Sequence, residues 1–264
     1  MKIAANLSLL FTELPLLERI AAAAAAGFDG VEVQFPYDMP AALFKEELER
    51  CGIPLVLINL PAGDLMHEGV GLAAVPERQR QFDEALDQAL SYAAIARPFS
   101  VNVLPGRLAD NTSRAAALDV LVVNLRKAAE AFESLDIKVL FEAINPLDMP
   151  GFLINTPEHL REVLRRVAHS NCWAQLDLYH MARQGINLSK AINLLKGEIG
   201  HVQFADCPGR GAPGTGQLDI LSTVSLLPEW CGDIWLGAEF IPQGATENNL
   251  RWLQEWRAKL PGCE

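Results

Sequence analysis

The chain has 264 residues, half of them hydrophobic, which is enough to bury a large core as one α/β barrel or as two small domains. Its formal charge of −11, with no cluster of Lys and Arg, argues against a nucleic-acid partner, because such proteins gain affinity by neutralising phosphates. The five cysteines are scattered without a C-x-x-C pair, which argues against a zinc or dithiol site and favours a reducing, cytoplasmic compartment.

The amino-terminal residues do not resemble a secretion signal. Residues 2–7 begin the chain without a charged segment followed by an apolar core of roughly 7–15 residues. Apolar stretches also stay below the length of about 20 residues that a membrane-spanning helix needs. We therefore expect neither a leader peptide nor a membrane partner.

Short apolar runs alternate with segments of helical spacing along the whole chain, which is typical of βα units and a parallel sheet. The runs begin near Lys2, Gly30, Pro54, Phe99, Lys138, Cys172, Gly200 and Ile234. Eight such units in 264 residues match the roughly 250-residue norm of the (β/α)8 TIM barrel. Because no linker or shift in composition interrupts them, we predict a single barrel domain over residues 1–264.

Helix start signals agree with this division. Pro15 suits the first turn of the first helix, and the alanine run at residues 21–26 predicts a closely packed helix that Gly27 ends. Thr156, followed by Pro157, predicts the capped start of the fifth helix. Long polar connections follow the third and seventh strands, at residues 61–78 and 207–217, on the side where barrel active-site loops lie.

Four oxygen-bearing side chains stand at the ends of the last four predicted strands: Glu142, Asp177, Gln203 and Glu239. One glutamate at a strand end is most often a solvated loop charge. Four such residues on consecutive strands converge at the carboxyl end of a barrel, where three carboxylates would repel one another unless a cation is present. Oxygen ligands favour Mg²⁺ or Mn²⁺, so we predict a divalent metal site here.

Other polar residues are candidates for binding a substrate. His180 follows Asp177 by three residues and could polarise a substrate oxygen or donate a proton, although a loop imidazole bonded to backbone is the alternative. Asn6 and Asn59 end the first and third strands and could bind substrate hydroxyls, or only cap the turns that follow. Glu32, in the second strand, could also bind substrate from the barrel wall.

The glycine-rich stretch at residues 208–216 lacks the Gly-Lys-Ser/Thr ending of a phosphate-binding loop. We therefore expect no nucleotide site and no organic cofactor. Its glycines allow the backbone to approach a ligand closely, and Arg210 offers a planar fork that suits a carboxylate. A simple surface turn is the alternative.

Several motifs, taken together, are familiar. They are Asn6-Leu7-Ser8, Phe11-Thr12-Glu13, Gly30-Val31-Glu32, Phe35-Pro36-Tyr37, Asn59-Leu60-Pro61-Ala62-Gly63-Asp64, Glu142-Ala143-Ile144-Asn145-Pro146, Pro150-Gly151-Phe152, Asp177-Leu178-Tyr179-His180-Met181, Gly200-His201-Val202-Gln203, Pro213-Gly214-Thr215-Gly216 and Glu239-Phe240. Over nearly the whole chain they resemble the hydroxypyruvate isomerase family and the related 2-oxotetronate isomerases, within the xylose-isomerase-like barrel superfamily.

The resemblance implies roles for the candidate residues. Glu142 and Glu239 become the acid/base pair and also metal ligands, while Asp177 and Gln203 complete the metal site. His180 and Arg210 would contact the substrate.

The sequence departs from the family in the loop after the seventh strand. Ala212 and Gln217 stand where hydroxypyruvate isomerases usually have glutamates. Residues 11–13 and 242–247 look more like the oxotetronate branch, whereas residues 144–146 and 150–152 look more like the hydroxypyruvate branch.

The expected reaction is the isomerisation of a short hydroxy-oxo acid through an enediolate that the metal stabilises, first of all hydroxypyruvate to tartronate semialdehyde. The isomerisation of 2-oxotetronate to 3-oxotetronate is the alternative within the family. A ketose 3-epimerase and a non-catalytic sugar-acid binding barrel are alternatives outside it. A multi-zinc endonuclease is disfavoured, because the chain has only five histidines. The sequence is compatible with a homo-oligomer.

Overall fold

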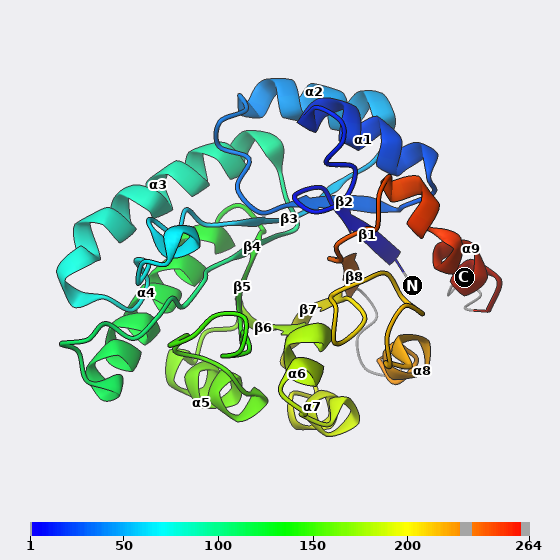
Figure 1. The fold of residues 1–264 in the computed structure, drawn as a ribbon. Coiled ribbons are helices and arrows are strands. Elements are labelled where there is room, and N and C mark those ends of the chain that lie inside the picture. The colour runs from blue at the N-terminus through cyan, green and yellow to red at the C-terminus, as the bar shows by residue number, and fades with distance from the viewer. Residues whose placement is uncertain (1, 228–233, 260–264) are drawn as a thin grey trace.

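Eight parallel strands form a closed barrel in the computed structural model, which describes residues 2–227 and 234–259 (Figure 1). The strands are β1 (Lys2–Asn6), β2 (Gly30–Val33), β3 (Leu55–Asn59), β4 (Ser100–Asn102), β5 (Lys138–Glu142), β6 (Cys172–Asp177), β7 (Ile199–Phe204) and β8 (Trp235–Ala238). Each strand pairs with the next, and β1 and β8 lie side by side where the ring closes. The predicted TIM barrel is confirmed.

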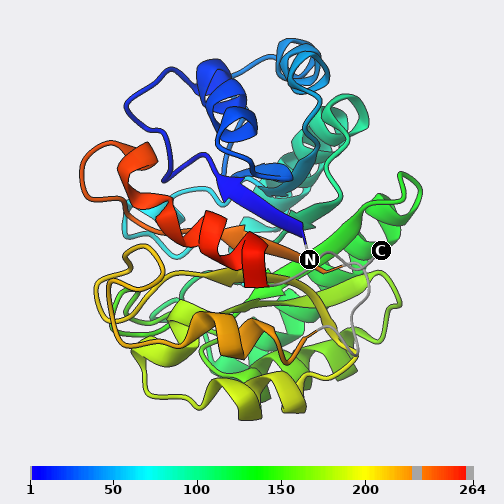
Figure 2. The ribbon, with the colours of Figure 1, turned by 90° about the vertical axis from the view of Figure 1, so that its right-hand side faces the viewer.

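Helices surround the strands and cover their outer surface (Figure 2). They are α1 (Leu16–Ala25), α2 (Ala41–Cys51), α3 (Gln79–Ala96), α4 (Arg114–Glu133), α5 (Pro157–Val167), α6 (Leu178–Arg183), α7 (Leu188–Leu194), α8 (Ile220–Val224) and α9 (Arg251–Lys259). Short 3₁₀ helices are η1 (Leu65–His67), η2 (Pro76–Arg78) and η3 (Thr246–Asn249). None of the helices in the described part of the chain is long and apolar enough to cross a membrane.

The start signals read from the sequence lie where the helices begin. Pro15 immediately precedes α1, and the Oγ1 atom of Thr156 accepts the N–H of His159 at the start of α5. Proline at the first position of α5 loses no hydrogen bond, because the first N–H groups of a helix have no partner within it. These local signals explain why the helical units could be counted from sequence.

Strand register places the polar strand ends within two residues of one another along neighbouring strands. Asp177 is paired with Gln203, and Gln203 in turn with Gly237, two residues before Glu239. At the ring closure Ala5 is paired with Ala238, so Asn6 and Glu239 follow at the same level. The carboxyl ends of β5 to β8 and of β1 therefore face one another.

Cysteines do not form disulfides in the described residues, where Cys51, Cys172 and Cys207 are free. The other two, Cys231 and Cys263, lie outside the described residues. Burial raises the pKa of the Cys172 thiol to about 12, so this group is an uncharged part of the core.

Candidate active site

The predicted strand-end residues gather at the carboxyl end of the barrel. Glu142 and Asp177 end β5 and β6, Gln203 is the penultimate residue of β7, and Glu239 directly follows β8. All four side chains are buried, with 2–6% of their residue surface exposed. A cavity of about 140 Å³ opens between them, smaller than the roughly 300–1,000 Å³ of pockets for drug-sized ligands.

This cavity is lined by Gln34, Asn59, Met66, Leu104, Glu142, Ile144, Asp148, Met149, Gln175, His180, Gln203, Arg210 and Glu239. Three of the four predicted metal ligands are among them, as are the predicted substrate residues His180, Arg210 and Asn59. The remaining ligand, Asp177, does not line the cavity, and its Oδ2 atom lies 3.6 Å from Nε2 of His180. The predicted site residues are thus brought together, although Asn6 does not line the cavity and instead donates a hydrogen bond to Glu239.

Glu142 carries an unusually basic carboxylate. Burial, and then the charges of Glu239 and Asp177, raise its pKa to about 8. A hydrogen bond of 2.8 Å from Asn102 Nδ2 to Glu142 Oε1 opposes the shift. A carboxyl that titrates near neutral pH can both take and return a proton, which is what acid/base catalysis requires.

Glu239 titrates in the same range. Burial raises its pKa to about 7, with Arg210 lowering it and Asp177 raising it further. Its Oε1 atom accepts hydrogen bonds from Asn6 Nδ2 at 3.0 Å and Gln34 Nε2 at 2.9 Å. Its Oε2 atom pairs with Arg210 Nη2 at 2.6 Å. Because both oxygens are held, the carboxylate is oriented before any ligand binds.

His180 is buried and has a defined tautomer. Its Nδ1 atom lies 2.7 Å from Asn145 Nδ2, and the Oδ1 atom of that amide already accepts the N–H groups of Leu147 and Asp148. The amide therefore presents its NH₂ to the ring, so Nδ1 is the acceptor and Nε2 carries the hydrogen. Burial lowers the pKa of His180, which keeps the ring neutral. Nε2–H can donate to a substrate oxygen.

Arg210 extends from the loop between β7 and α8 over the cavity. Its guanidinium pairs with Glu239 and lies over the ring of Tyr179, 5.2 Å from the ring centroid. The buried Nε atom has no hydrogen-bond partner among the described residues. That free donor suits the carboxylate of a ligand.

Asp206 organises this loop, a role that the sequence did not suggest. Its carboxylate accepts the backbone N–H groups of Cys207, Gly214, Gly216 and Leu218. Of the two departures from the family, Ala212 is buried in the core and Gln217 is exposed. Neither side chain lines the cavity.

The two asparagines predicted to bind substrate differ in position. Asn59 lines the cavity, and its Oδ1 atom accepts a hydrogen bond of 3.2 Å from Asn102. Asn6 is fully buried and donates to the carboxylates of Glu239 and Glu32. Substrate contact by Asn59 stays a prediction, whereas Asn6 lies where it orients a carboxylate and does not line the cavity.

Sequence reasoning missed Gln34, Asn145 and Gln175. Strand periodicity offered a signal for two of them, because Gln175 precedes Asp177 by two residues and Gln34 follows Glu32 by two. Side chains two apart on a strand point to the same face. Asn145 lies in the loop after β5, where strand periodicity does not predict the direction of a side chain. Its contact with His180 depends on how the loop folds.

The residues present fit a divalent cation. Ligand atoms of Glu142, Asp177 and His180 lie within 4.8 Å of one another. Burial, and then repulsion from Glu239 and Asp177, raises the pKa of Glu142, and a cation would relieve the repulsion. The His180 ring is an unsuitable ligand, because Nδ1 accepts from Asn145 and Nε2 carries the hydrogen. Gln203 Oε1 accepts one hydrogen bond, from Gln175, and keeps a second lone pair. The oxygen-only donor set suits Mg²⁺ or Mn²⁺.

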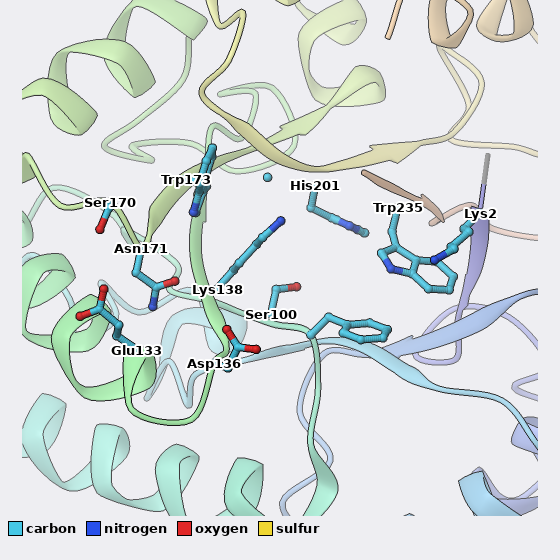
Figure 3. A pocket seen from close by; sticks show the side chains of 12 residues that line it. Lys2, Ser100, Glu133, Asp136, Lys138, Ser170, Asn171, Trp173, His201 and Trp235 are labelled. Atoms are coloured by element: carbon cyan, nitrogen blue, oxygen red, sulfur yellow. The ribbon is translucent and has the colours of Figure 1, made fainter. Parts of the chain in front are cut away.

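A larger cavity, of about 440 Å³, lies at the opposite end of the barrel (Figure 3). It is formed by the first residues of the strands, with the ammonium of Lys138 over the Trp173 ring and that of Lys2 over the Trp235 ring. Active sites of TIM barrels lie at the carboxyl end of the strands. The smaller cavity, which gathers the titratable residues, is therefore the candidate active site.

Comparisons with known proteins identify the family of the chain. The model of the xylose isomerase-like TIM barrel family matches residues 20–256. Hydroxypyruvate isomerase from Escherichia coli is 37% identical over 259 residues, covering 97% of this chain and 100% of the relative. The 2-oxo-tetronate isomerase of Pectobacterium atrosepticum is 35% identical over 258 residues, covering 98% of each chain. A crystal structure from Brucella melitensis, named AP endonuclease, family 2, superposes with a TM-score of 0.91 at 36% identity, covering 96% of this chain and 98% of its own.

Proposed function

Because the chain belongs to the xylose isomerase-like TIM barrel family, and its curated relatives are isomerases, we propose that it isomerises a short hydroxy-oxo acid. The observation that carries the proposal is the pair of buried glutamates, Glu142 and Glu239. Both line one small cavity, and their pKa values of about 8 and about 7 lie near neutrality. Two such groups can take a proton from one carbon and return it to the next.

The substrate we favour is hydroxypyruvate, with tartronate semialdehyde as the product. The relatives named for hydroxypyruvate and for 2-oxo-tetronate are 37% and 35% identical, so 2-oxotetronate remains the second candidate. A cavity of about 140 Å³ supports a small acid over a hexose. Arg210 supports a substrate with a carboxylate, because a guanidinium can bind one. The ketose substrate of an epimerase has no carboxylate.

In the proposed mechanism Arg210 binds the substrate carboxylate through its free Nε–H. One glutamate removes the proton from the carbon that bears the hydroxyl, and the hydroxyl proton passes to the former carbonyl oxygen. The other glutamate, which starts protonated, delivers a proton to the former carbonyl carbon. His180 donates its Nε2–H to a substrate oxygen as charge develops on it. A divalent cation, held by Glu142, Asp177, Gln203 and Glu239, would supply Lewis-acid stabilisation of that charge.

The deciding experiment follows hydroxypyruvate and, separately, 2-oxotetronate with the purified protein in D₂O by NMR. We expect one of them to be converted, with deuterium entering the carbon that receives the proton. Turnover that disappears with EDTA and returns with Mg²⁺ or Mn²⁺ would support the metal. Binding without deuterium incorporation would instead favour a non-catalytic barrel. Deuterium at the same carbon, without isomerisation, would favour an epimerase.

Three further properties complete the proposal: a cytoplasmic location, no organic cofactor, and a possible assembly of identical chains whose size gel filtration would measure. The three free cysteines of the described residues support a reducing compartment.

A further inference from the structure

Two glutamine amides inside the barrel are hydrogen-bonded in series to one buried carboxylate. Gln203 Nε2 donates to Glu32 Oε1 at 3.0 Å, and Gln175 Nε2 donates to Gln203 Oε1 at 2.6 Å. Glu32 has no exposed surface, and the two glutamines expose 1–2%. The polar groups in this series are therefore shielded from bulk solvent, and each depends on hydrogen bonds inside the barrel.

Glu32 accepts hydrogen bonds from three side chains. In addition to Gln203, His201 donates from Nε2 at 2.9 Å and Asn6 donates from Nδ2 at 3.3 Å. His201 approaches from the wall of the cavity at the opposite end of the barrel (Figure 3). The direction of the Asn6 amide is set separately, because its Oδ1 atom accepts the N–H of Ser8. Three donors thus converge on this carboxylate.

The carboxylate determines the direction of both amides. A carboxylate accepts only, so turning Gln203 over would put its oxygen against Glu32. Turning Gln175 over would then put two amide oxygens in contact. With both amides in their observed directions, Gln203 keeps one lone pair for a cation, and Gln175 Oε1 has no partner among the described residues. Gln175 lines the active-site cavity.

We propose that Glu32 is a positioning residue that aims the Gln203 oxygen at the metal, and that Gln175 Oε1 accepts the hydrogen bond of a substrate hydroxyl. The second part rests on the proposed function. A buried acceptor without a partner is unfavourable, and a hydroxy-oxo acid brings the donor that this atom lacks. Gln175 then distinguishes a hydroxy-oxo acid from an oxo acid of the same length, because only the former can satisfy it.

The substrate arm of the test uses Gln175→Met, with the affinity for hydroxypyruvate compared with inhibition by pyruvate, which lacks the hydroxyl. We expect hydroxypyruvate to bind about tenfold more weakly and pyruvate to bind as in the parent protein. The matched control is Gln79→Met, because Gln79 also donates to an amide, that of Asn124, but lies outside the barrel on α3. Unchanged affinities, or an equal loss for both acids, would overturn the assignment of Gln175.

The metal arm measures Mn²⁺ binding by calorimetry and needs no turnover. We expect Glu32→Gln to weaken Mn²⁺ binding by roughly 10–100-fold, the usual effect of losing a group that orients a ligand. Circular dichroism and thermal unfolding establish that the variant is folded. An unchanged Mn²⁺ affinity in the folded variant would overturn the role of Glu32. If the parent protein converts neither acid, the proposed function fails, whereas the affinities for the two acids still decide the Gln175 assignment and the Mn²⁺ comparison still decides the role of Glu32.

Discussion

Asn145 and His180 are joined by a hydrogen bond of 2.7 Å whose direction can be deduced from the neighbouring backbone. Since the Asn145 Oδ1 atom accepts the backbone N–H groups of Leu147 and Asp148, the NH₂ group of the same amide must donate to Nδ1 of the His180 ring. The proton of the neutral imidazole then sits on Nε2, the nitrogen nearer to Asp177.

Asn145→Ala removes the amide that fixes the tautomer of His180, so both neutral tautomers should become populated. We expect long-range ¹H–¹⁵N spectra to show an Nε2-protonated His180 in the parent protein and a mixture of tautomers in the variant. Turnover should fall about tenfold, the loss expected for one hydrogen bond. Asn193→Ala, at an exposed position on α7, is the control. An Nδ1-protonated ring in the parent protein would contradict the deduction.

Glu142→Gln and Glu239→Gln should each reduce kcat by about 10²–10⁴-fold, because each removes a group that transfers a proton. The amide keeps the shape of the side chain, so both variants should remain folded by circular dichroism. Glu130→Gln, an exposed glutamate of α4, should keep full activity. Near-normal rates in either active-site variant would exclude the assigned acid/base pair.

The metal-free protein should lose stability as the pH rises from about 4.5 to about 8. In that window the folded Glu142, whose pKa is raised to about 8, still holds a proton that the unfolded chain has released at its ordinary value of 4.5. The folded state therefore binds more protons, and the free energy of unfolding falls with pH by on the order of a few kcal/mol. Glu239, raised to about 7, acts in the same direction.

Urea unfolding in EDTA at pH 5.5 and pH 8.5 would measure this slope. Glu142→Gln should flatten it and should make the metal-free protein more stable than the parent at the higher pH. A free energy of unfolding that rises with pH in the parent protein would argue against the raised pKa values.

Arg210→Met should weaken the binding of acids selectively. We expect pyruvate to bind roughly 10–100-fold more weakly, because hydrogen bonds between charged groups are lost, while hydroxyacetone, which has no carboxylate, binds as before. Arg251→Met removes a guanidinium from an exposed ion pair with Glu255 and serves as the control. Equal weakening of both ligands would mean that Arg210 acts through Glu239 alone.

Gly237→Ala should destabilise the protein by about 1–3 kcal/mol, the usual cost of overpacking. A Cβ atom at this position would lie 2.2 Å from Glu32 Oε1, inside a ring of hydrogen bonds that leaves the carboxylate little freedom to move. Gly209→Ala is the matched change, because nothing lies within 4 Å of a Cβ atom there. Urea unfolding of both variants would test the difference, and equal stabilities would show that Glu32 can shift.

Local patterns were sufficient to predict the barrel. Each predicted strand start lies within one residue of the observed one, as for Lys2 in β1 and Ile234 before β8. Buried parallel strands are continuous apolar runs, and proline and threonine mark the starts of α1 and α5. The strand ends followed directly, which is why the metal and acid/base candidates could be named.

The contacts that hold those candidates could not be predicted in the same way. Glu32 and Gln203 are 171 positions apart, and their hydrogen bond exists only because the barrel interior is narrow. Periodicity places Gln175 on the inner face but does not say which inner side chain it meets. Asn6 likewise read as a substrate residue, since nothing in a short motif shows that β1 would bring it against Glu239.

The hydrogen bond between Asn6 and Glu239 joins residues 233 positions apart, at the seam where the first strand meets the last. During synthesis Asn6 leaves the ribosome long before Glu239 exists, so no nascent chain carries a finished catalytic centre. A proteolytic cut that removed β1 would take away the amide that orients the Glu239 carboxylate. We therefore expect the orientation of Glu239 to depend on the integrity of both the first and the last strand.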